Sequence, residues 1–427
     1  MHPRRPAARR RPVSAAFLAA ALVLSVSACS GVTGNARVET VEASGDGILR
    51  VGLILDNTGD SSFLNDSQRA AAELAVREIN ASGGHKGRPV ELLPVQADQD
   101  TAMQAHSLVS DKADVVIGPT DSSHATEAID VLSRARTPLI SPANTASALS
   151  SAESGGYYFR TAAADVAQGP VLAKLAKDGG AATLSVVHEE GSYGKDVSAA
   201  VADSARQIGL RVLDNTGFTA GDAGTAARTA AGAAPDAVVV IAREGAQGAL
   251  AELNNAGLSG ARLLLSDGAF ARYGLKLGAK ALDGARAVVP GHLPSAGFQA
   301  RLLEVDPDLK DVSFAAETYD AVTLAALAAA RAQDDAGRSI AANLVAVSGG
   351  TGADNASGGG APAPCLSYKA CVPGLASGGE VNYDGESGPV AFDTKGDITT
   401  ATFTVFTYGS DNIPAATGRE TAGRGGS

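Results

Sequence analysis

The sequence contains no tryptophan, and aromatic residues make up only 4% of its 427 residues. Glycine is frequent, with 50 residues, and alanine is used heavily. This composition is typical of an α/β protein with many tight turns and alanine-faced helices, and it excludes a fibrous or wholly disordered chain. The body of the chain also lacks any apolar run near the roughly 20 residues that a transmembrane helix needs. We therefore expect a globular chain, whose length predicts two or three domains.

Signatures of common enzymes are missing as well. The sequence has no G-x-x-x-x-G-K-[ST] phosphate loop, no H-E-x-x-H zinc helix and no G-x-S-x-G nucleophile elbow. The turn Leu55–Asp60 contains one glycine and cannot form a dinucleotide cradle. Gly385–Pro389 resembles the serine loop of chymotrypsin-like proteases, but the histidine context of that site is absent, so we interpret it as a glycine-rich turn. We predict that the protein is not an enzyme and uses no cofactor and no metal.

Basic residues are fewer than acidic ones, 35 against 46, which gives a net charge of −11. Nucleic-acid phosphates require clustered lysine and arginine, so this balance argues against nucleic acid as a partner. The only dense basic cluster, Arg4, Arg5 and Arg9–Arg11, precedes the apolar segment Val13–Val26. A positive region followed by such a segment is typical of a secretion signal.

The segment Val26-Ser27-Ala28-Cys29 follows directly and resembles a lipobox. We predict a lipoprotein signal peptide at residues 1–28, cleaved so that Cys29 carries lipid. The protein would then be exported and lipid-anchored on the outer face of the bacterial cytoplasmic membrane. An ordinary signal peptide, in which Cys29 is incidental, is the alternative. We interpret the polar residues 29–47 as a flexible linker. Cleavage removes five arginines and no acids, so the net charge of the mature protein is near −16.

Two further cysteines remain in this exported setting, Cys365 and Cys371. A disulfide that closes the segment CLSYKAC is the natural pairing, since exported proteins are exposed to oxidising conditions. A metal pair is the alternative, but no other cysteine is left and no histidine lies near in sequence.

The stretch Asp114–Ser147 carries the clearest structural pattern. The β-branched run Val115–Ile117 reads as a buried strand, Ser122–Arg136 has apolar residues close to helical spacing, and Pro138–Ile140 reads as the next strand. Strand, helix and strand in this order predict a βαβ unit with parallel strands.

Small hydroxylated residues follow both strands of this unit. Ligands bind outside the carboxyl ends of parallel strands, where helix N-termini present free N–H groups. The hydroxyls of Ser122, Ser123 and Thr145 lie at these ends and can hold a carboxylate. The alternative is that Asp121, Ser122 or Ser123 caps the helix.

The same alternation of strands and helices runs along most of the chain and restarts after a break at Tyr157–Thr161. We therefore predict an α/β fold with two doubly wound lobes, parallel sheets and a multi-crossover hinge. We expect the first lobe to comprise residues 48–160 and 291–400, and the second to comprise 161–290 and 401–413. Residues 414–427 are expected to form a disordered tail.

Several segments resemble one family in the order expected for it. They are RVGLILDNTG and AAELAVREINASGG within Arg50–Gly84, IGPTDSS and LISPANT within Ile117–Thr145, EEGSYGKD at Glu189–Asp196, LLLSDG at Leu263–Gly268 and ETYDAVTLAALA at Glu317–Ala328. The chain resembles the type I periplasmic binding proteins, specifically the branched-chain amino-acid-binding lipoproteins of ABC importers. The resemblance spans most of residues 48–410 and implies the two-lobed fold of that family.

The resemblance also implies roles for individual residues. Ser122 and Thr145 would supply hydroxyls to the carboxylate of an amino acid, and Ala143 would offer its backbone carbonyl to the ammonium. Asp267 falls at the acidic position of the second lobe, where relatives carry glutamate. Tyr193 would cover the ligand. The adjacent residues His188–Glu190 could instead form an acid/base cluster, and the implied role of Tyr193 argues against that interpretation.

Two departures from the family pattern concern the ligand. The aromatic cover of the first turn is represented only by Phe63 or Leu64, and the tyrosine-rich loop after Ala237–Ile241 is replaced by Arg243 and Glu244. These two charged residues are either solvated at the rim or select a polar or doubly charged ligand. We therefore expect an amino-acid-like small molecule, without committing to leucine.

The resemblance implies a monomeric substrate-binding protein of amino-acid transport, which delivers its ligand to an ABC transporter permease. A sensor that uses the same cleft to regulate a partner protein is the alternative function.

Overall fold

The computed structural model describes residues 1–2, 42–57, 62–291, 293–350 and 362–423. Cys29 and most of the predicted signal peptide and linker therefore lie outside the described residues. Across these described ranges, no helix is both long and apolar enough to cross a membrane.

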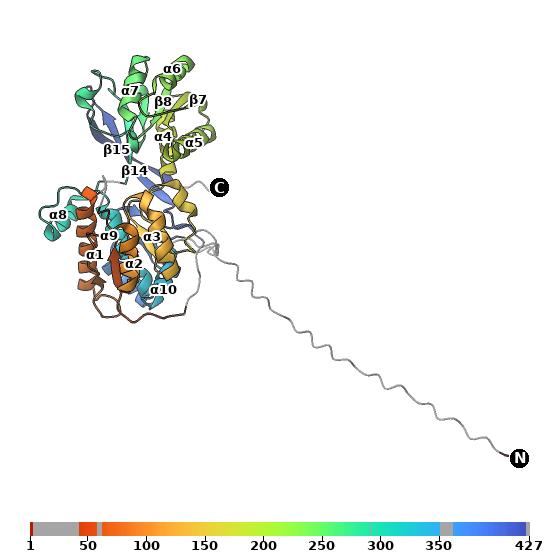
Figure 1. The fold of residues 1–427 in the computed structure, drawn as a ribbon, viewed down its shortest axis with the longest axis vertical. Coiled ribbons are helices and arrows are strands. Elements are labelled where there is room, and N and C mark those ends of the chain that lie inside the picture. Colours follow the sequence, from red (N-terminus) through yellow and green to blue (C-terminus); the bar gives the residue numbers. More distant parts are fainter. Residues whose placement is uncertain (3–41, 58–61, 292, 351–361, 424–427) are drawn as a thin grey trace. The chain divides into compact units, whose positions relative to one another are not determined.

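The first sheet has five parallel strands in the order β2-β1-β3-β4-β5. Its strands are β1 (Arg50–Leu53), β2 (Glu91–Leu92), β3 (Val115–Ile117), β4 (Leu139–Ser141) and β5 (Tyr158–Arg160). The helices that pack on it are α1 (Asn65–Ala81), α2 (Thr101–Ser110), α3 (Ser122–Ala135), α8 (Ala296–Val305), α9 (Ala315–Ala332) and α10 (Gly337–Val347). We call this sheet and its helices the first lobe (Figure 1).

Alternation along the strands divides the core of the first lobe into two layers. Val115 and Ile117 of β3 pack in one cluster with residues of α1 and α9, whereas Val116 between them packs in another with residues of α2 and α3. Successive side chains of a strand point to opposite faces of the sheet. Both faces are therefore covered by helices, which explains why β3 is apolar at all three positions.

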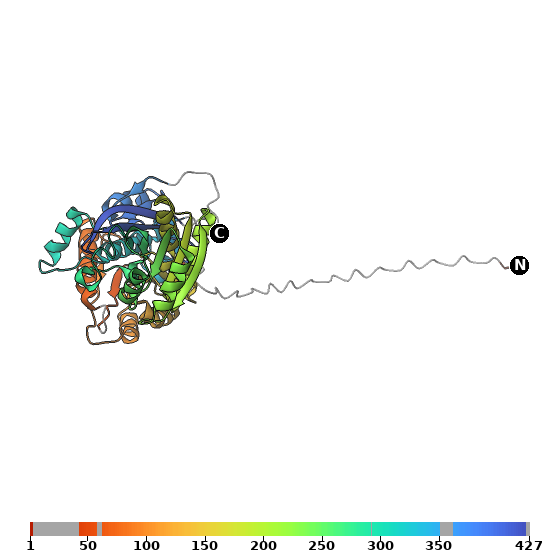
Figure 2. The ribbon, with the colours of Figure 1, turned by 90° about the horizontal axis from the view of Figure 1, so that it is seen from above.

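The second sheet has seven strands in the order β15-β14-β10-β9-β8-β6-β7. They are β6 (Thr183–Glu189), β7 (Arg211–Phe218), β8 (Ala237–Ile241), β9 (Leu263–Leu265), β10 (Arg286–Pro290), β14 (Thr400–Tyr408) and β15 (Pro414–Gly423). The second lobe also contains α4 (Gln168–Asp178), α5 (Ser192–Gln207), α6 (Gly224–Ala233) and α7 (Ala246–Asn255). Strands β6 to β10 pair in parallel, and the C-terminal hairpin β14–β15 adds antiparallel to β10 (Figure 1 and Figure 2, blue).

The second lobe shows the same two-layer core. Val238 and Val240 of β8 lie in a cluster with residues of α6 and α7, and Val239 and Ile241 lie in one with residues of α4 and α5. The prediction of two lobes with mixed α/β layers and parallel sheets is thus confirmed, with the antiparallel hairpin as an addition.

Sheet membership changes after Arg160, after Pro290 and before Thr400. At these three positions we propose that the chain crosses between the lobes. A small pocket is lined by residues from all three of these proposed crossings. It is lined by Thr161–Ala163, Pro290, Gly291, Ile398, Thr400 and Thr402, and by Phe314 and Glu317 from the start of α9.

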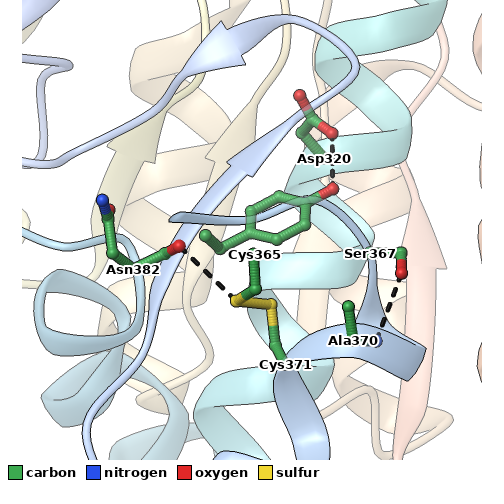
Figure 3. The surroundings of a disulfide bond; sticks show 7 residues. Asp320, Cys365, Ser367, Ala370, Cys371 and Asn382 are labelled. Carbon is green, nitrogen blue, oxygen red and sulfur yellow. Dashed lines mark hydrogen bonds between the residues drawn. A yellow bond between two sulfur atoms is a disulfide. The ribbon is translucent and has the colours of Figure 1, made fainter. Parts of the chain in front are cut away.

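A third, small sheet of β11 (Pro364–Cys365), β12 (Asn382–Gly385) and β13 (Gly388–Pro389) lies beside the first lobe with helix α11 (Tyr368–Ala376). Cys365 and Cys371 form a disulfide that joins β11 to α11, the pairing that the sequence predicts (Figure 3). The adjoining Tyr383 donates a hydrogen bond of 2.6 Å to Asp320 of α9. This contact ties the disulfide-bonded segment to the core of the first lobe.

Some predictions were wrong. Residues 414–423 are not a disordered tail, because strand β15 pairs with β14 along its whole length. Tyr158–Arg160 is the fifth strand of the first sheet and not only a connection between lobes.

Candidate functional site

Two predicted site residues, Ser122 and Ser123, lie where strand β3 meets helix α3, next to Asp121. The carboxylate of Asp121 accepts the N–H of Ser123 at 2.8 Å, so Asp121 is the cap of α3. Burial opposes ionisation of Asp121, but these hydrogen bonds from Ser123 prevail and lower its pKa. Ser122 is thereby free of the capping role, and its Oγ accepts the N–H groups of Thr145 and Ala146 at 3.2 and 3.3 Å. Ser123 is exposed on the first turn.

The loop after β4 carries Ala143 and Thr145. Arg160 holds this loop, because its guanidinium donates to the carbonyl oxygens of Asn144 and Ala146 at 3.2 and 2.9 Å. Ala143 is 7% exposed, and its N–H lies 3.3 Å from Ser141 Oγ. The loop is thus fixed by buried hydrogen bonds, with the partly exposed Thr145 next to Ser122.

In the second lobe, Asp267 opens the short 3-10 helix η5 (Asp267–Ala269) at the end of β9. Its Oδ1 accepts hydrogen bonds from Gln168 Nε2 at 2.7 Å, from Tyr193 Oη at 2.5 Å and from the N–H of Gly268 at 2.7 Å. Its backbone N–H donates to Gln168 Oε1 at 2.9 Å. Within the described part of the chain, Oδ2 of Asp267 has no hydrogen-bond partner, so one oxygen of a rigidly held carboxylate remains available.

Tyr193, in the first turn of α5, lies between Asp267 and the loop after β8. Its Oη lies 2.9 Å from Ser266 Oγ and accepts the N–H of Gly268 at 3.1 Å. Burial and the neighbouring Asp267 raise the pKa of Tyr193 well above its usual value. The guanidinium of Arg243 lies over its ring, 4.1 Å from the centroid.

Asp165, in the 3-10 helix η3 (Asp165–Ala167) after the first crossing, is a site residue that the sequence analysis missed. The residue is only 4% exposed, and its Oδ1 is buried without a hydrogen-bond partner among the described residues. Burial and the negative charge of Asp267 raise the pKa of Asp165 to about 6. The positive charge of Arg243 and a hydrogen bond with the side chain of Thr145 act in the opposite direction. A buried carboxylate oxygen without a donor is rare, and such an oxygen suits a cation or a hydrogen-bond donor.

Asp165 also connects the two lobes at the site. Its backbone N–H donates to the carbonyl oxygen of Thr145 at 2.8 Å, and its Oδ2 lies 3.6 Å from Arg243 Nη2. Asp165 therefore contacts Thr145 of the first lobe and Arg243 of the second. Arg243 in turn lies over the ring of Tyr193, and Asp267 is close enough to raise the pKa of Asp165. Ser122 joins this group through its bond to Thr145. A sequence signal existed, because the acid follows the first crossing and stands alone in a run of alanines.

Phe63 is the predicted residue that the structure does not bring to this group. It lies in the 3-10 helix η1 (Ser62–Leu64) and is 64% exposed. It adjoins residues 58–61, which are outside the described residues. Its neighbour Leu64, the other candidate for the aromatic cover, is buried at 8%.

The acid/base cluster considered at His188–Glu190 is dispersed. Glu189 accepts the N–H groups of Arg243 and Gly245, whereas Glu190 pairs with Lys195 at 2.8 Å. Burial lowers the pKa of His188. Three neighbouring side chains therefore serve separate contacts. In the ranges that the structure describes, no group of three His, Cys, Asp or Glu residues could hold a metal ion.

Comparison with known proteins agrees with this architecture. The chain is 31% identical over 180 residues to the leucine-, isoleucine-, valine-, threonine- and alanine-binding protein of Pseudomonas aeruginosa, a match that covers 41% of this chain and 48% of that protein. The chain thus spans about half the length of the curated relatives that it matches.

Solved structures extend the likeness of fold over most of the chain. The branched-chain amino acid transporter substrate-binding protein of Streptococcus pneumoniae, in complex with isoleucine, has a TM-score of 0.58 at 20% identity over 88% of this chain and 99% of that chain. A solute-binding protein of R. palustris in complex with 4-hydroxybenzoate has a TM-score of 0.61 at 16% identity, over 88% and 96% of the two chains.

These relatives and neighbours are solute-binding proteins and not enzymes. The family model described as "Periplasmic binding protein" matches residues 48–360, which is most of the chain. The chain therefore belongs to the periplasmic binding protein family.

Proposed function

We propose that the protein captures an amino-acid-like small molecule between its two lobes and delivers it to an ABC transporter permease. The curated relatives bind amino acids, and the residue types of the candidate site match that chemistry. Hydroxyls from the first lobe suit a carboxylate, and carboxylates from the second lobe suit an ammonium.

The pair of acids Asp165 and Asp267 carries this proposal. Each has one carboxylate oxygen without a hydrogen-bond partner among the described residues, and that oxygen is buried in Asp165. A charged acid in such a position is costly unless a cation pairs with it. An ammonium group would pair with the negative charge of both acids. It would thereby offset the repulsion from Asp267, which together with burial raises the pKa of Asp165.

The opposite end of the ligand would meet Ser122 and Thr145. The Oγ of Ser122 already accepts two N–H groups, so its own proton is free to donate to a ligand carboxylate. Such charge-assisted hydrogen bonds contribute about 1.5–3 kcal/mol each. A ligand held from both lobes favours the conformation in which the lobes approach.

Calorimetry with a panel of amino acids tests the proposal. We expect Thr145→Ala to weaken binding by about 1.5–3 kcal/mol, which is roughly ten- to a hundredfold. Asp267→Ala is expected to cost more, about 2–5 kcal/mol, because it leaves the ligand ammonium without a partner. Melting curves without ligand separate a loss of binding from a loss of folding.

Matched controls are available on exposed helix surfaces of the second lobe. Thr229→Ala removes a hydroxyl that bonds only its own helix, and Asp203→Ala removes an exposed partner of Arg206. Both control variants should bind as the unaltered protein does. Affinity unchanged in Thr145→Ala and Asp267→Ala, or no binding by the unaltered protein to any amino acid, would reject the site.

We also propose that the protein is exported, that it acts as a monomer and that Cys29 carries the lipid that anchors it to the membrane. Support comes from the sequence, where a lipobox-like segment follows an apolar one. One acyl chain binds a membrane only marginally, whereas two or more anchor stably. Mass spectrometry of the N-terminal peptide tests the assignment, and an unmodified Cys29 or cleavage at another residue would contradict it.

A further inference from the structure

Arg243 occupies a prominent place in the candidate site that the proposed function does not yet use. Strand β8 is buried at all five positions, and Arg243 follows it by two residues at the carboxyl end of the sheet. Its side chain is 55% exposed. Ligands of open α/β sheets bind at this end of the strands, so the guanidinium lies where it can contact a bound ligand.

The surrounding residues hold Arg243 in place. Glu189 Oε2 accepts its backbone N–H at 2.7 Å, and the ring of Tyr193 lies beneath the guanidinium. Gly268 leaves room for this stack, since a Cβ there would lie 2.7 Å from Arg243 Cγ and 3.0 Å from Tyr193 Oη. Stacking on an aromatic ring orients an arginine without using its N–H donors.

Those donors make no hydrogen bond in the part of the chain that the structure describes, and the closest carboxylate, Asp165 Oδ2, is 3.6 Å from Nη2. Arg160 in the same chain shows what a structural arginine looks like, with an ion pair of 2.7 Å to Asp397 and a fully buried side chain. Arg243 differs from Arg160 in three ways. Its closest carboxylate is 3.6 Å away, its side chain is 55% exposed, and its guanidinium is oriented by the ring of Tyr193.

Arg243 also carries a positive charge beside the two acids of the site. Its Nη2 lies 3.6 Å from Asp165 Oδ2, and Asp267 in turn raises the pKa of Asp165. The field of Arg243 also reaches Asp121 of the first lobe and helps to lower its pKa. A guanidinium fork matches a carboxylate geometrically and binds it with two parallel hydrogen bonds.

We propose that Arg243 determines specificity by binding a second anionic group on the ligand, so that the preferred solutes are amino acids with an acidic side chain. This inference rests on the proposed function, because it assumes that the α-ammonium and α-carboxylate are bound as described above. It replaces the alternative in which Arg243 is a solvated rim residue.

The test compares acids with their neutral isosteres by calorimetry, using L-glutamate against L-glutamine and L-aspartate against L-asparagine. The unaltered protein should bind one acid at least about tenfold more tightly than its amide, the scale of one close charge pair. Arg243→Gln should bring acid and amide to within about twofold of each other, because the charge that distinguishes them is gone. Arg243→Lys keeps the charge without the planar fork and should retain part of the preference.

Arg228→Gln, on the exposed face of α6, is the matched control and should keep the full preference. Equal binding of acid and amide by the unaltered protein, tighter binding of L-leucine than of either acid, or an unchanged preference in Arg243→Gln would overturn the inference and leave the proposed function intact. Failure of the unaltered protein to bind any amino acid would overturn both.

Discussion

Arg160 Nε donates to Asp397 Oδ1 at 2.7 Å, in an ion pair that joins the end of the first sheet to the residues just before β14. Arg160 is 0% exposed and Asp397 is 2% exposed. The same guanidinium holds the carbonyl oxygens of Asn144 and Ala146, on either side of Thr145. One buried arginine therefore links two of the proposed crossings to the loop of the candidate site.

Removing either partner of this pair should destabilise the protein strongly. We expect Asp397→Ala to lower the free energy of unfolding by about 3–5 kcal/mol, because it leaves a buried guanidinium without its counter-charge. Urea denaturation measures the loss. Arg206→Met, which breaks the exposed pair with Asp203, should cause a barely measurable change. A comparable loss in the two variants would show that burial does not govern the effect.

Asp121 and Ser122 are adjacent, yet we expect their replacement to have different effects. Asp121→Ala removes the cap of α3 and should lower stability by about 1 kcal/mol, with ligand affinity nearly retained. Ser122→Ala should weaken binding by about 1.5–3 kcal/mol, since it removes the proposed donor to the ligand carboxylate. Melting curves and calorimetry on both variants check this division. If Asp121→Ala weakened binding as much as Ser122→Ala, the two roles would not be separable.

Ligand affinity should depend on pH through Asp165. Burial raises the pKa of this carboxyl to about 6, and only the ionised form pairs with an ammonium. Affinity should therefore be constant above about pH 7 and decrease as the pH falls through 6, because the bound proton must leave first. The stability of the ligand-free protein should change in the opposite direction. Because the carboxyl pKa is raised in the folded state, the free energy of unfolding should fall as the pH rises from about 4 to 6. Calorimetry from about pH 5 to pH 8 measures the first effect, and Asp165→Asn should bind more weakly with little of this dependence.

Reduction of the disulfide should affect stability more than binding. Cys365 and Cys371 are six residues apart, and closing so short a loop contributes about 2 kcal/mol in the chain-entropy model. The bond lies beside the first lobe, against α9, and none of the predicted ligand-binding residues belongs to this segment (Figure 3). We expect a lower melting temperature with reductant and in the Cys365→Ser, Cys371→Ser double variant, with ligand affinity retained. Two free thiols in the exported protein, or loss of ligand binding on reduction, would contradict this assignment.

Much of the fold could be predicted because local patterns and tertiary packing agree. Helix α3 spans Ser122–Ala135, within one residue of the predicted Ser122–Arg136, and β8 is apolar throughout because helices cover both of its faces. Strand β15 is different, since PAATGRETAG has no apolar alternation and only one buried residue. Its conformation is imposed by pairing with β14, which a local pattern does not contain.

The candidate site was only partly predictable, for a similar reason. Residues at strand ends, such as Ser122 and Thr145, follow from the βαβ pattern. Asp165 stands out in sequence only as a lone acid among alanines, and neither it nor Arg160 shows in sequence that its charged side chain is buried. Their burial arises from the crossings, which bring distant segments around them.

The C-terminal strand has a practical consequence for handling the protein. Nine antiparallel pairs with β15 satisfy the outer edge of β14, which carries the buried residues Phe403, Val405 and Tyr408. A chain shortened after Ile413 would leave this apolar edge unpaired, and an exposed edge strand is a template for pairing with other chains. Such a truncation, which a disordered tail would tolerate, should therefore promote aggregation.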